Sequence, residues 1–305
     1  MSNFAVETSE LTKIYSGRRV VDEVNMHIPQ GSIYGFVGEN GSGKTTIMRL
    51  LMGLANPSKG RYSLFDVDFK NKNIYSIRKH VSAIVEAPSI VASMTAYQNL
   101  EYACQYFGIK NYKQVIPELL ESVGLGDVGK KKAGNFSLGM RQRLGIALLL
   151  LNNPELVLLD EPMNGLDPTG VAELRDIIIN LNKKGITFLI SSHILSELEK
   201  VATHWGFISH GKLLNELSNE ELAMACKKSI ELSHHDLKGL EKALKEIGIK
   251  EYKNFPNSIR VFDDILPITL LEKLKKEGFE IKSIKTIDTN VEEYYLSLIG
   301  GAKNV

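Results

Sequence analysis

The sequence Gly38-Glu39-Asn40-Gly41-Ser42-Gly43-Lys44-Thr45 fits the pattern G-x-x-x-x-G-K-[ST] and decides how the rest of the chain is interpreted. It follows a nearly continuous apolar run, Ser32–Val37, and precedes Thr45–Met52, whose residues favour a helix. Glycines let consecutive backbone N–H groups turn toward phosphate oxygens, and the start of a helix adds its positive end. Lys44 supplies a charge near the β- and γ-phosphates, and Thr45 offers a hydroxyl to Mg²⁺. The stretch predicts a nucleotide phosphate site between a strand and a helix.

A second stretch, Leu156-Val157-Leu158-Leu159-Asp160-Glu161-Pro162, reads as a buried strand that ends in two acids. A carboxylate at the carboxyl end of such a strand is where Mg²⁺ beside a phosphate loop needs a ligand, so we expect Asp160 in the metal shell. Glu161 is placed to polarise the attacking water. A strand ending in a helix-capping acid is the alternative, and the presence of the phosphate loop favours the metal site.

The order of apolar runs predicts an α/β fold. Alternating apolar and polar residues in Phe4–Thr8 and Val20–Ile28 indicate antiparallel strands at the amino terminus. Ile186–Ile190 is a third buried-strand candidate, and segments of helical period separate it from the other two. This arrangement predicts a parallel sheet covered on both faces. Apolar residues at three-and-four spacing in Tyr97–Val128 predict an inserted helical lobe.

The pattern changes after residue 213. Its elements alternate as strand, helix, strand, strand, helix and strand, if a short strand near Tyr252 is included, which suggests a small α+β unit with a ferredoxin-like fold. These elements are Ser229–Ser233, Leu237–Ile247, Ser258–Phe262, Leu266–Lys276 and Phe279–Lys285. We place the boundary within residues 219–228 and expect a nucleotide-binding domain at 1–222 and a carboxy-terminal accessory domain at 223–305.

Composition narrows the class of protein further. The 305 residues carry 37 Lys and Arg against 36 Asp and Glu, a formal net charge of +1 that disfavours nucleic acid as a partner. The longest apolar run, Leu144–Leu151, is far shorter than the roughly 20 residues of a membrane-spanning helix. Cys104 and Cys226 suggest neither a disulfide framework nor a zinc site, and Met1–Glu10 lacks the pattern of a signal peptide. We expect a soluble chain of a reducing compartment.

Three further motifs occur in the order found in ATP-binding cassette ATPases. Asn135-Phe136-Ser137-Leu138-Gly139-Met140-Arg141-Gln142-Arg143 resembles that family's signature motif, usually L-S-G-G-Q followed by a basic residue, Q and R. Asn164-Gly165-Leu166-Asp167 resembles its D-loop, and His193 resembles its switch histidine. Tyr15 is placed like the aromatic residue that stacks on adenine. The resemblance covers residues 4–215 and implies a P-loop NTPase cassette with a mixed sheet, an antiparallel β edge and a helical lobe.

Departures from the family pattern point to one branch. Leu138 and Met140 stand where the usual signature has a small residue and the glutamine, which leaves Ser137 and Gly139 to contact a γ-phosphate. Glu86 stands where the family normally has a glutamine that contacts Mg²⁺. With the carboxy-terminal sequence Tyr294–Gly301, these features resemble the bacitracin and lantibiotic export or self-protection branch of the bacterial transporters.

The resemblance implies a mechanism for ATP and Mg²⁺ in which two cassettes pair head to tail, most simply as a homodimer. It implies that hydrolysis drives a separate transmembrane permease, which holds the chain on the cytoplasmic face of the cell membrane. Glu161 and His193 are the expected catalytic residues. The expected metal ligands are Thr45, Glu86 and Asp160. The expected nucleotide-binding residues are Tyr15, Gly38, Glu39, Asn40, Gly41, Ser42, Gly43, Lys44, Thr45, Thr46, Ser137, Gly139 and Asp167.

Two other functions stay open from the sequence. A soluble cassette ATPase that acts on ribosomes or DNA would usually carry two cassettes or a coiled-coil insertion, and neither is visible. A regulatory module that closes on ATP without hydrolysing it is disfavoured by the intact Asp160-Glu161 pair and by His193. We expect His234-His235 to be surface residues, because no ligand spacing accompanies them.

Overall fold

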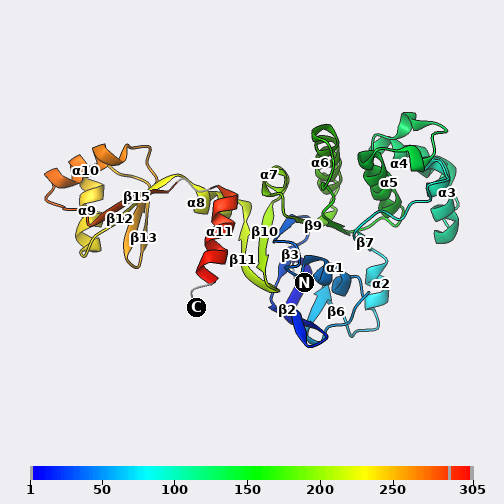
Figure 1. Cartoon of the computed structure of the whole chain (residues 1–305), viewed down its shortest axis with the longest axis horizontal. Coiled ribbons are helices and arrows are strands. Elements are labelled where there is room, and N and C mark those ends of the chain that lie inside the picture. Colours follow the sequence, from blue (N-terminus) through cyan, green and yellow to red (C-terminus); the bar gives the residue numbers. More distant parts are fainter. Residues whose placement is uncertain (1–2, 288–289, 303–305) are drawn as a thin grey trace. The chain divides into compact units, whose positions relative to one another are not determined.

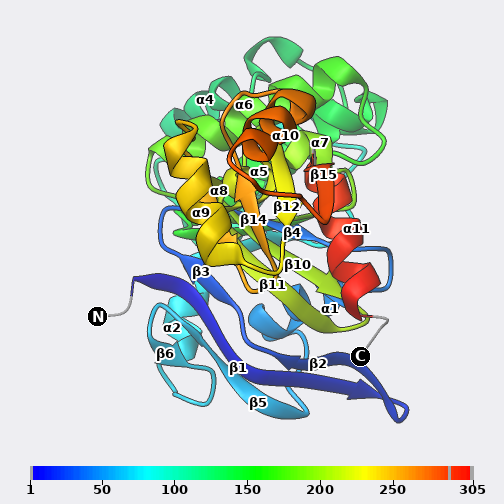
Figure 2. The ribbon, with the colours of Figure 1, turned by 90° about the vertical axis from the view of Figure 1, so that its left-hand side faces the viewer.

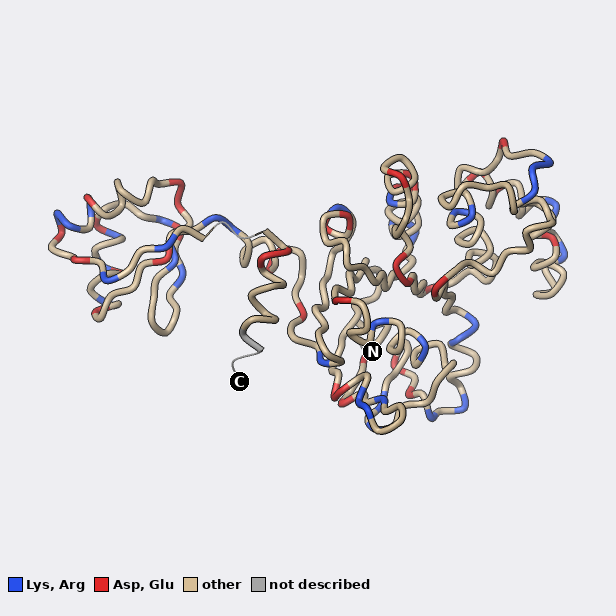
Figure 3. Tube along the Cα trace, in the orientation of Figure 1, with Lys and Arg blue, Asp and Glu red and all other residues tan. Residues whose placement is uncertain are grey.

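The computed structural model describes residues 3–287 and 290–302. It divides into two compact units, Met1–Asn219 and Glu220–Val305 (Figure 1). Lys and Arg alternate with Asp and Glu along both units (Figure 3), in keeping with the formal net charge of +1. The domain boundary expected between residues 222 and 223 stays a prediction.

The first unit begins with a mostly antiparallel sheet, as the alternating amino-terminal sequence predicts. Its strand order is β2-β1-β5-β6, and β3 also pairs with β1. A two-residue hairpin joins β1 to β2, with positive φ at Ser16 (47°) and Gly17 (80°), the turn type that matches the twist of paired strands. The strands are β1 (Phe4–Tyr15), β2 (Arg18–Val24), β3 (His27–Pro29), β5 (Lys59–Leu64) and β6 (Val67–Asp68).

A six-stranded sheet of order β11-β10-β4-β9-β8-β7 forms the centre of this unit. All neighbours run parallel except β11, which is antiparallel to β10. Every residue of β4, β8 and β9 is buried, which confirms the three buried strands expected from their apolar sequences. The strands are β4 (Ile33–Val37), β7 (Val81–Ile84), β8 (Leu156–Asp160), β9 (Thr187–Ser192), β10 (His204–Ser209) and β11 (Lys212–Ser218).

Helix α1 (Lys44–Leu51) lies between the two sheets and shares one core with them. Ile47, Leu50 and Leu51 of α1 are fully buried with Val24 of β2 and Phe36 of β4. The other helices outside the lobe are α2 (Ile74–Arg78), α6 (Pro168–Lys183) and α7 (Leu195–Leu198). The position of the phosphate loop is therefore fixed by a helix that is packed on both sides.

Three helices pack together beside the end of the central sheet that carries β7 (Figure 1). They are α3 (Ala96–Phe107), α4 (Tyr112–Ser122) and α5 (Leu138–Leu150), with short 3₁₀ turns at Gly126–Val128 and Ala133–Asn135. Two of them, α3 and α4, lie in the Tyr97–Val128 segment that was predicted as a helical lobe. Thr95 and Gln98 form a reciprocal capping box at the start of α3. Within residues 3–287 and 290–302, no helix is long and apolar enough to cross a bilayer.

The second unit has the ferredoxin-like topology expected from its sequence. Its four strands pair in the order β13-β14-β12-β15, and every pair is antiparallel. Helices α9 and α10 lie on the same side of β12 and β14 (Figure 2), and Leu240, Leu244, Leu270 and Leu274 of these helices form the core with the strands. The elements are α8 (Asn219–Cys226), β12 (Ser229–Ser233), α9 (Leu237–Glu246), β13 (Tyr252–Phe255), β14 (Ser258–Val261), α10 (Pro267–Lys276), β15 (Ser283–Ile287) and α11 (Val291–Ala302).

The prediction of the last strand was wrong in its bounds. It was expected at Phe279–Lys285, whereas β15 spans Ser283–Ile287. Phe279 and Ile281 instead pack against the core as part of the loop that follows α10. Apolar side chains mark burial, and burial alone does not show whether the backbone pairs with a neighbouring strand.

The packing of Tyr34 against Gly206 leads to a prediction about stability. Tyr34 is 1% exposed, its hydroxyl donates to Glu216 Oε1 at 2.7 Å, and burial with this carboxylate nearby raises its pKa well above 10. A Cβ at Gly206 would overlap the Tyr34 ring and hydroxyl. We expect Gly206→Ala to lower the free energy of unfolding by about 1–3 kcal/mol, the usual cost of overpacking a core.

Urea unfolding followed through Trp205, the single tryptophan and fully buried in β10, measures this loss. Gly300→Ala is the control, because nothing lies within 4 Å of a Cβ at that exposed position of α11. Equal unfolding midpoints for Gly206→Ala and the unchanged protein would contradict the predicted clash.

Candidate functional site

The phosphate loop connects the end of β4 to the start of α1. Gly43, the residue before α1, has φ of 110°, a conformation that L side chains rarely adopt. Gly38 has no room for a side chain, because a Cβ there would lie 2.5 Å from Ser42 Oγ and 2.6 Å from the Ile208 carbonyl oxygen. The glycines of the motif are thus required by backbone geometry and by close packing.

The loop encloses a cavity of about 140 Å³. Most of its lining comes from the predicted phosphate loop and from the two acids that end β8. The lining residues are Val20, Asn40, Gly41, Ser42, Gly43, Lys44, Thr45, Thr46, Asp160 and Glu161. Backbone N–H groups at the start of a helix, next to a lysine, form a cavity suited to phosphate.

Lys44 places its charge inside this cavity. Its side chain is 6% exposed, and Nζ donates to the carbonyl oxygens of Gly38 (2.5 Å) and Glu39 (3.1 Å). Nζ also lies 3.5 Å from Glu161 Oε1. A buried ammonium needs such partners, and phosphate oxygens are stronger partners than carbonyl groups because they are charged.

Asp160 joins α1 to the central sheet. Thr45 Oγ1 donates to Asp160 Oδ2 at 2.6 Å, and Ser191 Oγ donates to Asp160 Oδ1 at 2.5 Å. A hydroxyl and a carboxylate side by side are the hard oxygen donors that Mg²⁺ prefers. The sequence reasoning missed Ser191. Its signal was a polar pair, Ser191-Ser192, at the end of an otherwise apolar strand.

Glu161 and His193 meet at the ends of β8 and β9. Glu161 Oε2 lies 2.8 Å from His193 Nδ1 and 3.4 Å from the His193 backbone nitrogen, which donates to it. Glu161 has φ of 49°, so its backbone turns sharply after the strand and directs the carboxylate toward His193 and Lys44. The structure thus brings together three segments that lie far apart in the sequence: Lys44, the adjacent acids Asp160 and Glu161, and His193.

Tyr15 and Glu86, which were expected to contact adenine and Mg²⁺, make other contacts in the structure. Tyr15 ends β1 with its side chain 44% exposed, and Lys13 Nζ lies 4.8 Å from the centre of its ring. Glu86 has positive φ (72°) and forms an ion pair with Arg49 of α1, rather than a contact with Thr45 or Asp160. The exposed Tyr15 ring can therefore receive a flat ligand on one face. Glu86 is instead held in its ion pair with the guanidinium of Arg49.

The signature and D-loop residues form a second group at the starts of α5 and α6. Ser137 caps α5 by accepting a hydrogen bond from the Met140 backbone nitrogen at 3.2 Å, and Asp167 caps α6 by accepting one from Gly170 at 2.9 Å. Ser137, Gly139 and Asp167 are absent from the residues that line the phosphate cavity. The expected nucleotide contacts therefore divide between two surfaces of the first unit.

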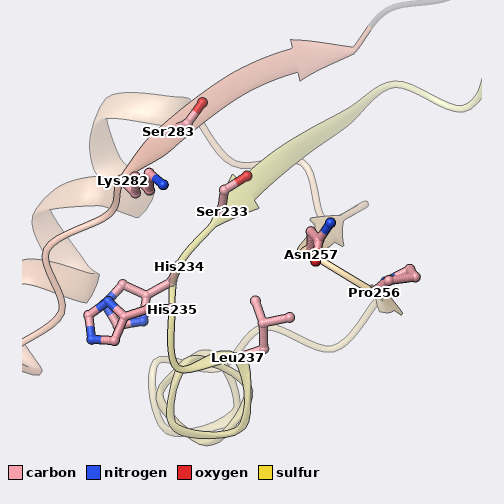
Figure 4. Close-up of a pocket in the computed structure, with 8 residues that line it drawn as sticks. All are labelled: Ser233, His234, His235, Leu237, Pro256, Asn257, Lys282 and Ser283. Carbon is pink, nitrogen blue, oxygen red and sulfur yellow. The ribbon is translucent and has the colours of Figure 1, made fainter.

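A cavity of about 520 Å³ lies in the second unit (Figure 4). The imidazoles of His234 and His235 project to one side of the chain that follows β12, whereas Asn257 and Pro256 lie on the other side. Its lining residues contain no Asp or Glu. The cavity therefore lacks the glycine loop and the pair of acids that line the site in the first unit.

The fold and the site define a nucleotide-binding cassette of the P-loop NTPase class. Residues 21–164 match the family model described as ABC transporter. The chain is 42% identical over 301 residues to the bacitracin transport ATP-binding protein BcrA of Bacillus licheniformis, covering 97% of both chains. It is 41% identical over 211 residues to the lantibiotic transport ATP-binding protein SrtF of Streptococcus pyogenes, covering 69% of this chain and 90% of the relative. The chain belongs to the ATP-binding subunits of ABC transporters, and such subunits bind and hydrolyse ATP.

Solved structures agree with this fold. The cbiO1 protein of Clostridium perfringens, part of the ABC transporter complex cbiONQ, superposes with a TM-score of 0.66 at 24% identity and covers 73% of this chain and 92% of its own. A dimeric ATP-binding cassette, MJ0796, bound to ADP and Pi gives a TM-score of 0.62 at 22% identity, over 70% of this chain and 98% of its own. At these identities the likeness supports the fold of the first unit.

Proposed function

We propose that this chain couples ATP hydrolysis to a separate membrane permease and that Glu161 acts on the attacking water. The observation that carries the proposal is the position of the Glu161 carboxylate, 3.5 Å from Lys44 Nζ and 2.8 Å from His193 Nδ1. A carboxylate at the mouth of a phosphate loop is placed to accept the proton of a water that attacks the γ-phosphorus. Lys44 and the loop amides hold the phosphates, and His193 orients Glu161 and contacts the γ-phosphate.

The residues present fit Mg²⁺. Thr45 Oγ1 and Asp160 Oδ2 are 2.6 Å apart and offer two hard oxygen donors. In residues 3–287 and 290–302 no cluster of three or more His, Cys, Asp and Glu could hold a metal by itself, so phosphate and water would complete the shell. Glu86 is a further proposed ligand, and its ion pair with Arg49 has to open first. When bound, Mg²⁺ neutralises charge on the phosphate oxygens.

We propose that two copies of the chain complete the site. Ser137, Gly139 and Asp167 lie outside the lining of their own phosphate cavity, and a two-fold homodimer would bring them to the nucleotide of the partner. The Ser137 hydroxyl can donate to a phosphate oxygen and keep accepting from the Met140 backbone nitrogen. Tyr15, exposed at the end of β1, would stack on the adenine ring.

The transported molecule is proposed from the relatives. BcrA is named for bacitracin transport and SrtF for lantibiotic transport. We propose that the permease exports a peptide antibiotic, or protects the cell from one, and that it holds this chain at the cytoplasmic face of the membrane. Residues 223–305 would form an accessory domain. They match BcrA along with the cassette, whereas the SrtF match spans 69% of this chain.

Replacing Glu161 by Gln tests the catalytic role. The amide keeps the size of the side chain but cannot accept a proton, so we expect the rate of ATP hydrolysis to fall at least about 100-fold while ATP binding persists. Phosphate release measures the rate, and a fluorescent ATP analogue measures binding. Glu197→Gln is the control, since Glu197 of α7 forms an ion pair with Lys200, just after that helix. Unchanged hydrolysis by Glu161→Gln would remove Glu161 from this role.

The proposed dimer has a separate test. ATP should dimerise Glu161→Gln, because the trapped nucleotide joins both copies, and light scattering measures the mass. Adding Ser137→Ala should weaken that dimer at least about tenfold, the effect of one hydrogen bond to a charged group. Ser122→Ala, an exposed serine of the same lobe, should leave it unchanged. A dimer that is insensitive to Ser137→Ala would contradict the predicted contact.

Purification from solubilised membranes tests the partner. If the chain drives a permease, a tagged copy should retain a protein with several membrane spans, and mass spectrometry identifies it. Co-sedimentation with ribosomes or retention of DNA would instead favour a cassette ATPase without a permease. Nucleotide-dependent closure without hydrolysis and without a bound protein would favour a regulatory module.

A further inference from the structure

Ser191 lies in β9 between the strand before the phosphate loop and the strand that carries the acids. It is 0% exposed and follows three fully buried apolar residues of the same strand, Phe188–Ile190. In the parallel register it is the direct neighbour of Asp160 in β8 and of Phe36 in β4. A buried hydroxyl at this position needs hydrogen-bond partners, because leaving it unpaired destabilises the fold.

Its hydroxyl is paired twice. Oγ donates to Asp160 Oδ1 at 2.5 Å and accepts from the Glu161 backbone nitrogen at 2.9 Å. The donated bond leaves Asp160 Oδ2 facing Thr45 Oγ1, so the carboxylate cannot rotate without losing a bond. The accepted bond holds the backbone of Glu161, whose φ of 49° is unfavourable for a residue other than glycine.

We propose that Ser191 is a positioning residue that orients the Mg²⁺-facing oxygen of Asp160 and holds the turn that directs Glu161. The proposal rests on the proposed function, because it assumes that Asp160 and Thr45 receive Mg²⁺. His193 follows two residues later on the same strand end and contacts Glu161. The buried Ser191 hydroxyl therefore links Asp160 and Glu161 to the strand end that carries His193.

The test is the Mg²⁺ dependence of nucleotide binding in the full chain. The affinity for a fluorescent ADP analogue is measured in excess EDTA and in excess Mg²⁺, and the ratio of the two dissociation constants is compared. In Ser191→Ala, Asp160 loses a donor and gains rotational freedom. We expect this ratio to fall about 10- to 100-fold, the usual effect of removing a residue that orients a metal ligand. The nucleotide affinity measured in EDTA should stay within about twofold of that of the unchanged protein.

Three variants separate positioning from general damage. Ser82→Ala removes another buried serine of the same sheet, one that donates to the Leu149 carbonyl oxygen at 3.3 Å, and should leave the ratio unchanged. Ser191→Thr keeps the hydroxyl and should restore the ratio. If Ser191→Ala does not fold, Ser191→Cys, with a weaker donor of similar size, should give an intermediate ratio.

The outcomes are distinguishable. If nucleotide binding by Ser191→Ala or Ser191→Cys depends on Mg²⁺ as strongly as binding by the unchanged protein, Ser191 has no positioning role. The proposed function still stands in that case. Equal weakening with and without Mg²⁺ also overturns the positioning role, because that result indicates a structural role. Wild-type binding without any Mg²⁺ dependence overturns the proposed metal site itself, and with it this inference.

Discussion

Parallel pairing of β4, β9 and β8 is the constraint on which the site depends. In parallel strands the carboxyl ends meet at one edge of the sheet, and the register aligns Val37 with Ser192 and Asp160 with Ser191. The loop after Val37 therefore opens beside the acids that end β8. All three strands are buried throughout, so the edge is held by a rigid core.

Electrostatics decides how the residues at that edge are arranged. Lys44 is 6% exposed and lies among carbonyl oxygens and the Glu161 carboxylate, so its charge is compensated within the protein. Asp160, also 6% exposed, receives two hydroxyl donors and forms no ion pair within the described part of the chain. The two hydroxyl donors fix the direction of both carboxylate oxygens. The cavity of the phosphate loop is thus lined by a positive group, Lys44, and by negative groups, Asp160 and Glu161.

In the second unit, the spacing of apolar residues predicted the helices more accurately than the last strand. Leu240, Leu244, Leu270 and Leu274 recur at four-residue spacing, and both helices lie where this spacing predicts them. The strand after α10 was predicted too early, because Phe279 packs against the core, partly buried, without belonging to a strand. Pairing depends on where β12 lies, and the sequence around residue 280 carries no information about its partner strand.

Local sequence patterns were enough to predict the phosphate loop, the strand ending in Asp160-Glu161, the antiparallel amino-terminal strands and the helical lobe. These are local: spacing, glycine content and apolar period specify them within a few residues. The tertiary structure decided which distant groups meet. It paired Glu86 with Arg49, Glu161 with His193, and Asp160 with both Thr45 and Ser191. Such contacts depend on strand order and register, which arise from the packing of the whole unit.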